Sequence, residues 1–250
     1  MNIQFASVSF AYQQQQAALK NLSLEIAEGE RILIVGHNGA GKSTFLKLIN
    51  GLLKPTLGSI HVDGKDTRHT PTALLAGLVS VTFQHPGDQI FAASVGKELA
   101  FAPTNLKRSN SEQLIANAAH IFELDTLLDK HPYDLPPAHR KLLTVASAVA
   151  SDAPILAFDE PSAGLSHFER QTLQSALQTM TNKTLIIVSH DFDLFVPLCT
   201  RVLVLSGGLL LFDGAPTHFI DAAPSFRRAG VQLPLAMRLR TVLERSLRSS

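Results

Sequence analysis

The sequence predicts an α/β protein with a parallel central sheet, preceded by an antiparallel β region. Three short apolar runs without alternation, at 31–35, 155–158 and 185–188, are separated by segments with helical periodicity. A strand that is buried on both faces of a parallel sheet has this continuous apolar pattern. Strands that alternate with helices along the chain are typical of the α/β class.

The first thirty residues instead have the period of half-buried strands. Apolar or aromatic side chains recur at every second position in two runs, Val8, Phe10, Tyr12 and Leu22, Leu24, Ile26. This period places the side chains of each run on one face of a strand. The polar residues 13–16 lie between the two runs and predict the loop of an antiparallel pair.

The remaining elements follow from the same patterns. An apolar stripe over 45–52 predicts a helix, the segments 58–62 and 78–83 predict strands, and 168–180 predicts a helix. Residues 86–150 are expected to be mostly helical. We therefore expect one domain over 1–230 with a helical subdomain at about 86–150.

The end of the chain predicts a separate amphipathic helical tail at 231–250. Its apolar side chains share one helical face, and 227–250 holds six arginines against one glutamate. Such a basic amphipathic segment most often docks against its own protein, and less often contacts a membrane surface or a partner.

Composition excludes several classes of protein. Cys199 is the single cysteine of the 250 residues, so neither a disulfide framework nor a cysteine-rich zinc site is expected. The 22 Lys and Arg residues balance 21 Asp and Glu residues, which argues against nucleic acid as a partner. No apolar stretch approaches the roughly 20 residues of a spanning helix, and the start lacks a basic signal region. We expect a cytoplasmic protein.

A phosphate-binding loop follows the first apolar run. It matches G-x-x-x-x-G-K-[ST] with Gly36, His37, Asn38, Gly39, Ala40, Gly41, Lys42, Ser43 and Thr44. The glycines let main-chain N–H groups surround a polyphosphate, and the following helix offers its positive end. We expect Lys42 to reach the β- and γ-phosphates and the Ser43 hydroxyl to coordinate Mg²⁺.

Two acidic residues end the apolar run at 155–158. Asp159 would lie at the carboxyl end of a strand, where open α/β sheets bind ligands, and so would meet the metal beside Ser43. Glu160 follows it and can polarise a water for attack on the γ-phosphate. Two adjacent acids also occur in solvated turns, but the phosphate loop favours a catalytic interpretation.

The order of these motifs resembles the ATP-binding cassette family across nearly the whole chain. Three further positions fit the family pattern by their place in this order. Tyr12 resembles the aromatic residue that stacks on adenine, and Gln84 resembles the glutamine that reaches Mg²⁺ and the attacking water. His190 resembles the histidine that contacts the γ-phosphate. The resemblance implies ATP and Mg²⁺ as ligands, and Lys42, Gln84, Glu160 and His190 as catalytic residues.

Short segments resemble one branch of that family more closely. Residues 83–91, 98–103 and 230–234 are similar to the ATPases of energy-coupling factor transporters, which import vitamins and transition-metal ions. This resemblance implies an ATPase subunit, peripheral on the inner face of the cell membrane. A transmembrane coupling subunit would dock near Asp88–Phe91, with Ile90 and Phe91 in an exposed turn. The alternative is that both side chains belong to the core of the helical region. A substrate-binding membrane subunit would be reached indirectly.

Two segments depart from the family pattern. The signature Leu-Ser-Gly-Gly-Gln stands here as Leu135-Pro136-Pro137-Ala138-His139, which lacks the hydroxyl and has two prolines without N–H groups. Ser166 stands where the family usually has an aspartate. In this family both segments serve the partner subunit. We therefore expect a heterodimer with a second, non-identical cassette subunit, in which one composite site is degenerate.

Three other functions stay open on the sequence. A nucleotide-gated subunit without useful turnover is favoured by the altered signature and opposed by Glu160. A soluble cassette ATPase that acts on DNA or ribosomes is opposed by the near-neutral charge and by residues 83–91. A small-molecule kinase is supported by the phosphate loop alone.

Overall fold

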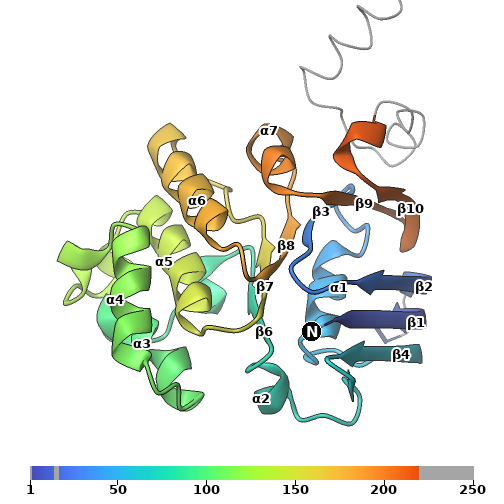
Figure 1. Ribbon diagram of the computed structural model, residues 1–250, viewed down its shortest axis with the longest axis horizontal. Helices are drawn as coiled ribbons and strands as arrows, with labels where there is room; N and C mark the ends of the chain where they lie inside the picture. The colour runs from blue at the N-terminus through green and yellow to red at the C-terminus, as the bar shows by residue number, and fades with distance from the viewer. Residues whose placement is uncertain (1, 14–16, 220–250) are drawn as a thin grey trace, which may run out of the picture.

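The computed structural model describes residues 2–13 and 17–219 (Figure 1). Within these ranges, an antiparallel four-stranded sheet has the order β2-β1-β4-β5. Its strands are β1 (Ile3–Ala11), β2 (Ala17–Ile26), β4 (Leu57–Val62) and β5 (Lys65–Asp66). The two half-buried strands predicted near the start of the chain are β1 and β2, which pair with Ile3 opposite Ile26. The antiparallel β region is confirmed.

The second described sheet has six strands in the order β10-β9-β3-β8-β7-β6. They are β3 (Arg31–Val35), β6 (Val79–Thr82), β7 (Ile155–Asp159), β8 (Thr184–Val188), β9 (Arg201–Ser206) and β10 (Leu209–Gly214). All neighbours pair in parallel except β9 with β10. The three apolar runs of the sequence are β3, β8 and β7, which lie side by side, so their carboxyl ends meet at one edge.

The helices are segregated around the sheets (Figure 1). They are α1 (Lys42–Ile49), α2 (Thr72–Leu75), α3 (Val95–Asn105), α4 (Ser111–Ile121), α5 (Pro137–Ala150), α6 (His167–Thr179) and α7 (Phe192–Phe195). Helices α3, α4 and α5 fall in the range predicted as helical and gather beside the six-stranded sheet, away from the four-stranded one. Helix α1 lies between the two sheets.

Two hydrophobic cores cover the two faces of the six-stranded sheet. Leu33 and Val35 of β3 belong to the core shared with the helices α3 to α6. Ile32 and Ile34 belong to the core shared with α1 and the four-stranded sheet. All four side chains are fully buried, and each such burial stabilises the fold by about 1.5–3 kcal/mol. Burial on both faces explains the apolar run without alternation.

Several expectations end differently in the structure. Helix α1 ends at Ile49, and Leu52, the last residue of the predicted stripe, is exposed. Tyr12 follows the end of β1 and is 40% exposed. The tail at 231–250 and the segment 230–234 lie outside the described residues.

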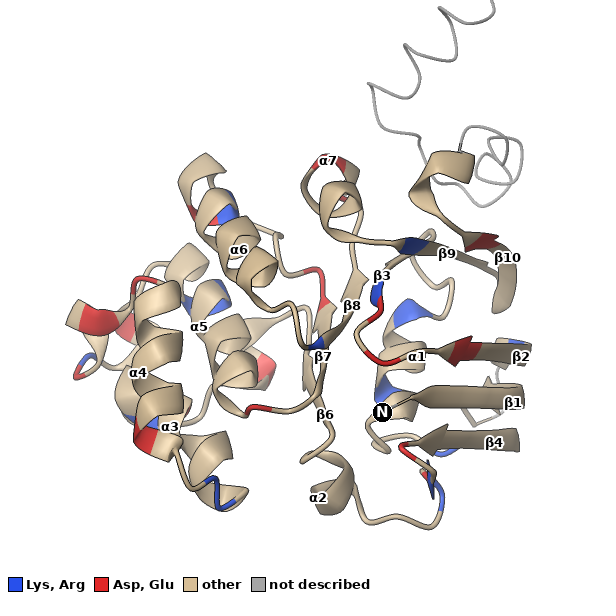
Figure 2. Cartoon of the chain, viewed as in Figure 1, with Lys and Arg blue, Asp and Glu red and all other residues tan. Residues whose placement is uncertain are grey.

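Within the described part of the chain, no helix is long and apolar enough to cross a membrane. Acidic and basic positions are interspersed over the elements (Figure 2).

Candidate functional site

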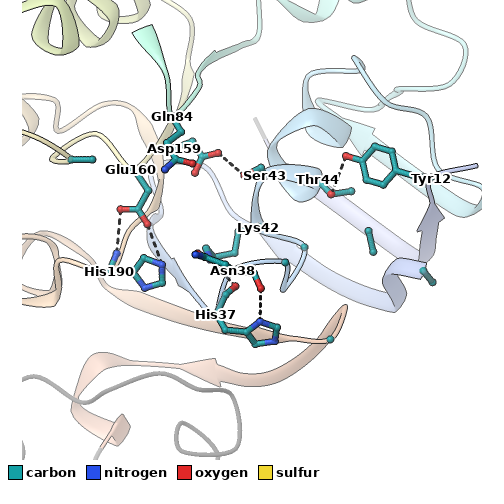
Figure 3. A pocket seen from close by; sticks show the side chains of 16 residues that line it. Tyr12, His37, Asn38, Lys42, Ser43, Thr44, Gln84, Asp159, Glu160 and His190 are labelled. Atoms are coloured by element: carbon teal, nitrogen blue, oxygen red, sulfur yellow. Dashed lines mark hydrogen bonds and ion pairs between the residues drawn. The ribbon is translucent and has the colours of Figure 1, made fainter. Parts of the chain in front are cut away.

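A cavity of about 980 Å³ lies at the carboxyl ends of the parallel strands, beside the start of α1 (Figure 3). It is lined by every site residue predicted from the sequence except Gly36 and Ala40. Segments that are far apart in the chain therefore meet at one place. Ala17, Ala18, Ala163 and Gly207 also line the cavity, and no feature of the sequence marked them.

Gly36 and Gly41 are required by the close approach of other strands. A Cβ on Gly36 would lie 2.2 Å from the carbonyl oxygen of Leu205 in β9. A Cβ on Gly41, whose φ is +105°, would lie 2.4 Å from the carbonyl oxygen of Ala18 in β2. The loop can therefore lie against β2 and β9 only with glycine at both positions. Gly36 thus shapes the cavity without lining it, as does the buried Ala40.

The start of α1 has the properties of an anion site. Its N-cap residue is Gly41, so no side chain caps the helix, and its first N–H groups are left for a ligand. The Lys42 ammonium is nearly buried and donates to the carbonyl oxygens of Gly36 at 2.6 Å and His37 at 3.0 Å. Burial lowers the pKa of Lys42, while Glu160 and Asp159 oppose this shift. The hydrogen-bond partners of this ammonium are uncharged carbonyl oxygens. A bound polyphosphate would supply the negative charge that they lack.

Ser43 and Asp159 offer hard oxygen atoms at the same edge. The Ser43 hydroxyl donates to Asp159 Oδ2 at 2.6 Å, which joins α1 to the end of β7 (Figure 3). Mg²⁺ is usually held by one or two carboxylates together with substrate phosphates. The donor set of this pair therefore fits Mg²⁺ beside a bound polyphosphate.

Glu160 is held in an unusual conformation. Its φ of +48° is in the left-handed region, which is uncommon for residues other than glycine and which clusters at functional sites. Its N–H donates to the carbonyl oxygen of Val188 at 2.8 Å, which fixes it against β8. The carboxylate Oε1 is buried and accepts no hydrogen bond from the described residues. An acceptor of this kind is suited to bind a water or a ligand.

His190 and Ser189 surround the Glu160 carboxylate. Oε2 accepts a hydrogen bond from the Ser189 hydroxyl at 3.1 Å and from the main-chain N–H of His190 at 3.4 Å. The His190 Nε2 atom lies 3.4 Å from Oε1. Ser189 is fully buried and was not among the predicted site residues. The only signal for it was a hydroxyl residue between a buried strand and the predicted histidine.

Gln84 is exposed at the cavity and is fixed through its main chain. Its carbonyl oxygen accepts a hydrogen bond from the Lys141 ammonium at 2.9 Å. Lys141 is buried in α5, and burial lowers its pKa to about 8, against the opposing effect of Asp159 and Glu160. Lys141 was not among the predicted site residues; a lysine within an apolar helical segment is a weak signal for it.

Tyr12 lies on the other side of the loop. Its hydroxyl is 3.3 Å from Thr44 Oγ1, and its ring packs edge-on against Phe10 with centroids 4.9 Å apart. The half-exposed ring lines the cavity, as a residue that stacks on a base must. Adenine stacking on Tyr12 stays a prediction.

The altered signature segment lies apart from this cavity, and none of residues 135–139 lines it. Leu135 is buried in the helical core, whereas Pro136 and Pro137 are exposed at the start of α5. Because prolines occupy both positions, the first main-chain N–H that α5 offers belongs to Ala138.

Ser166, which replaces the usual aspartate, precedes α6. Its N–H donates to the Glu169 side chain at 2.9 Å, and its hydroxyl contacts the same carboxylate. The serine and glutamate together form a capping box. The departure from the family pattern thus provides a stable start for α6.

The expected docking turn needs a correction. Ile90 is buried in the helical core at 4% exposure, so the prediction that it is exposed is wrong, whereas Phe91 is 64% exposed. The turn is fixed from inside: the Gln89 side chain bonds the main chain of Phe83 at 2.8 Å, and the Glu98 carboxylate accepts from the N–H of Phe91 at 3.2 Å. With both ends held, Ile90 points inward.

Comparison with known proteins tests the family resemblance. The family model described as ABC transporter matches residues 19–163. The energy-coupling factor transporter ATP-binding protein EcfA2 of Clostridium tetani is 33% identical over 261 residues, covering 99% of this chain and 89% of that protein. The protein of the same name from Methanospirillum hungatei is 32% identical over 243 residues, but the chain spans only 61% of its length and the match covers 95% of this chain.

Among solved structures, cbiO1 from Clostridium perfringens, described as part of the ABC transporter complex cbiONQ, is similar with a TM-score of 0.78. It is 28% identical, and the match covers 95% of this chain and 98% of that one. The family model and the solved structure agree with the fold. The chain therefore belongs to the ABC transporter family, as an ATP-binding protein and ATP hydrolase.

Proposed function

We propose that this chain is the ATP-hydrolysing subunit that energises an energy-coupling factor-type membrane importer of a vitamin or transition-metal ion. The observation that carries the proposal is the meeting of Lys42, Asp159 and Glu160 around one cavity. The segments 83–91 and 98–103 and the names of the relatives from Clostridium tetani and Methanospirillum hungatei support the transporter class.

The roles of the residues follow from their chemistry. Lys42 and the N–H groups at the start of α1 bind the phosphates. Glu160 positions and polarises the attacking water through Oε1, which accepts no hydrogen bond from the described residues and lies 3.4 Å from His190 Nε2. Ser189 fixes the direction of that carboxylate. His190 contacts the γ-phosphate next to Glu160. Catalysis in such phosphoryl transfer comes mainly from positioning and from electrostatic stabilisation.

Mg²⁺ would be held by Ser43 and Asp159, with Gln84 beside them. When bound, it would supply charge neutralisation at the β- and γ-phosphates. Tyr12 would stack on the adenine and orient the nucleotide through the contact of its hydroxyl with Thr44.

The altered signature supports a heterodimer with one degenerate site. In such a dimer, this chain's Lys42 and Glu160 would meet the partner's signature, while the partner's nucleotide would meet residues 135–139 of this chain. Pro136 and Pro137 remove N–H donors, and no hydroxyl replaces the missing serine. Each donor directed at developing charge is worth roughly 2.7–4 kcal/mol in a dry site, so we infer that the second site hydrolyses slowly or not at all.

Phe91 marks the surface for the transmembrane coupling subunit. Its exposed ring packs edge-on against Phe101, which is 48% exposed, with centroids 4.5 Å apart. A second cavity of about 540 Å³ lies next to the turn and is lined by Phe83, His85 and Asp88 among others. An exposed aromatic pair beside a cavity suits an apolar helix end of a membrane subunit.

The test is co-expression with a second cassette subunit and membrane subunits, followed by reconstitution in lipid vesicles. We expect MgATP-dependent uptake of one compound from a panel of vitamins and transition-metal ions. Phe91→Asp should lose the membrane subunits during purification, whereas the control Leu57→Asp, at a leucine 67% exposed on the four-stranded sheet, should keep them. Co-purification of both variants would remove the docking proposal, and hydrolysis without uptake of any compound would count against the importer.

A further inference from the structure

The structure contains a buried lysine that the proposed mechanism does not use. Lys141 lies in the first turns of α5 and is only 3% exposed. Its ammonium donates three hydrogen bonds, to the carbonyl oxygens of Phe83 at 3.3 Å, Gln84 at 2.9 Å and Asp159 at 3.3 Å. Lysine is almost never buried unless its charge and its donors are satisfied.

The three acceptors match the three donors of the ammonium, and they belong to two different strand ends. Phe83 and Gln84 directly follow β6, and Asp159 ends β7. Both strands are parallel neighbours, and their pairing ends at Thr82 and Phe158. Lys141 therefore continues the connection between β6 and β7 at the point where the sheet pairing stops.

Charge explains why a lysine suits this position. Asp159 and Glu160 both favour the charged form of Lys141, as they favour that of Lys42. The two acids thus interact with two cations, one from α1 and one from α5. Lys42 belongs to the phosphate loop, whereas Lys141 contacts only main-chain carbonyls, so its position does not depend on a nucleotide.

We propose that Lys141 is a positioning residue that fixes Gln84 and Asp159 relative to each other and links both to the start of α5. The proposal rests on the proposed function as a MgATP hydrolase, in which Gln84 and Asp159 serve the metal. Through Lys141, α5 is connected directly to Gln84 and Asp159. The altered signature residues Pro136 and Pro137 stand at the start of the same helix.

The test compares Lys141→Met with Lys54→Met in the full chain. Lys54 is the matched control, since its ammonium also donates to main-chain carbonyls, those of Thr67 and Thr70, but in the region of the four-stranded sheet. In the nucleotide-free protein, hydrogen exchange of the amides at 83–85 should become about tenfold faster in Lys141→Met and stay unchanged in Lys54→Met.

The second readout separates positioning from loss of structure. Turnover of MgATP by the assembled complex should fall about tenfold in Lys141→Met, while ATP affinity of the chain measured in EDTA stays within about twofold. If Lys141→Met does not fold, Lys141→Gln replaces it, because the amide keeps a donor in the buried site. A folded variant with unchanged exchange at 83–85 and unchanged turnover would overturn the proposal.

Failure of the proposed function would look different. Wild-type chain that binds no MgATP in a calorimetric titration would remove the hydrolase assignment, whatever the variants do. The exchange measurement needs no nucleotide, so it tests the link between α5 and the two strand ends by itself.

Discussion

Two regions of the molecule differ in how many of the expected nucleotide-binding groups they keep. The first comprises residues 36–44 and 159–160, and the second comprises residues 135–139. In the first region, every predicted side chain lies at one cavity or shapes it, and Lys42, Ser43 and Glu160 are joined to neighbours by hydrogen bonds. In the second region, two exposed prolines stand at the start of α5, and the helix has no side-chain cap. The chain thus keeps the groups that act on its own nucleotide, while the groups for a partner's nucleotide are altered.

At the two proline positions, the difference has no origin in the packing of the hydrophobic core. Leu135, the one member of the second region that is deeply buried, is the one that fits the family signature. The altered positions begin with Pro136, where the chain becomes exposed. Of the altered positions, Pro136 and Pro137 are exposed, whereas Ala138 packs against the helical core and His139 Nδ1 is buried. The exposed prolines support a change of function at the partner's site rather than a structural compensation.

The largest expected effect is that of Glu160→Gln. The substitution keeps the size and the hydrogen-bonding ability but removes the carboxylate, so turnover of the assembled dimer should fall by about 10²–10⁴ while ATP binding persists. The equivalent substitution in the partner should cost less than about twofold, because that site meets the altered segment. Steady-state phosphate release measures both.

Equal losses from these two substitutions would break the comparison. They would mean that residues 135–139 serve a working site despite the prolines. A loss only in the partner variant would reverse the assignment of the active site.

The second effect is on nucleotide affinity. Lys42→Ala removes the ammonium from the phosphate loop, so the ATP affinity of the purified chain should weaken at least about tenfold, or about 1.4 kcal/mol. Pro136→Ala is the matched control from the other region and should leave this affinity unchanged, since it does not line the cavity. Calorimetric titration of the single chain measures both affinities. Weaker ATP binding by Pro136→Ala would show that the second region contributes to the chain's own nucleotide site.

Sequence patterns were sufficient for the parts of the molecule in which local chemistry dictates structure. The doubly buried strand β3 needs a continuous apolar run, and the loop after it needs glycine at 36 and 41, so both were predictable from the residues. Asp159 followed because strand ends converge in a parallel sheet.

Other features depend on contacts between distant segments and gave at most a weak local signal. Ile90 was expected to be exposed, yet the side chains of Gln89 and Glu98 fix the turn and point it inward. Lys141 and Ser189 act on residues that are 57 and 29 positions away in sequence, so only the fold reveals their partners. The periodicity of the sequence does not predict such contacts between side chains and distant segments of the chain.

A smaller effect is expected from Ser189→Ala. It removes the hydrogen bond that fixes the direction of the Glu160 carboxylate, a contribution of about 1 kcal/mol, so turnover should fall roughly threefold to tenfold with ATP affinity unchanged. The control Ser147→Ala removes a hydroxyl of α5 that donates to the carbonyl oxygen of Glu98 at 3.2 Å, and it should leave turnover unchanged. Equal turnover in Ser189→Ala and wild type would show that the strand end alone positions Glu160.

The smallest effect tests whether the prolines of the second region are needed for folding. Pro136 is the N-cap residue of α5, with φ −53° and ψ 151°, a conformation that serine also adopts at helix starts. Pro136→Ser adds a side-chain cap worth about 0.5–2 kcal/mol and loses about 0.4–1 kcal/mol of restriction in the unfolded chain. The net change in unfolding free energy should therefore lie between about −0.5 and +1.6 kcal/mol, a melting shift of roughly 3–6 °C at most. Pro132→Ser is the matched control, because Pro132 is buried in the same region and its loss should destabilise the chain more. If thermal unfolding instead shows Pro136→Ser to be the more damaging of the two, the prolines have a structural purpose, and the altered signature no longer argues for a degenerate site.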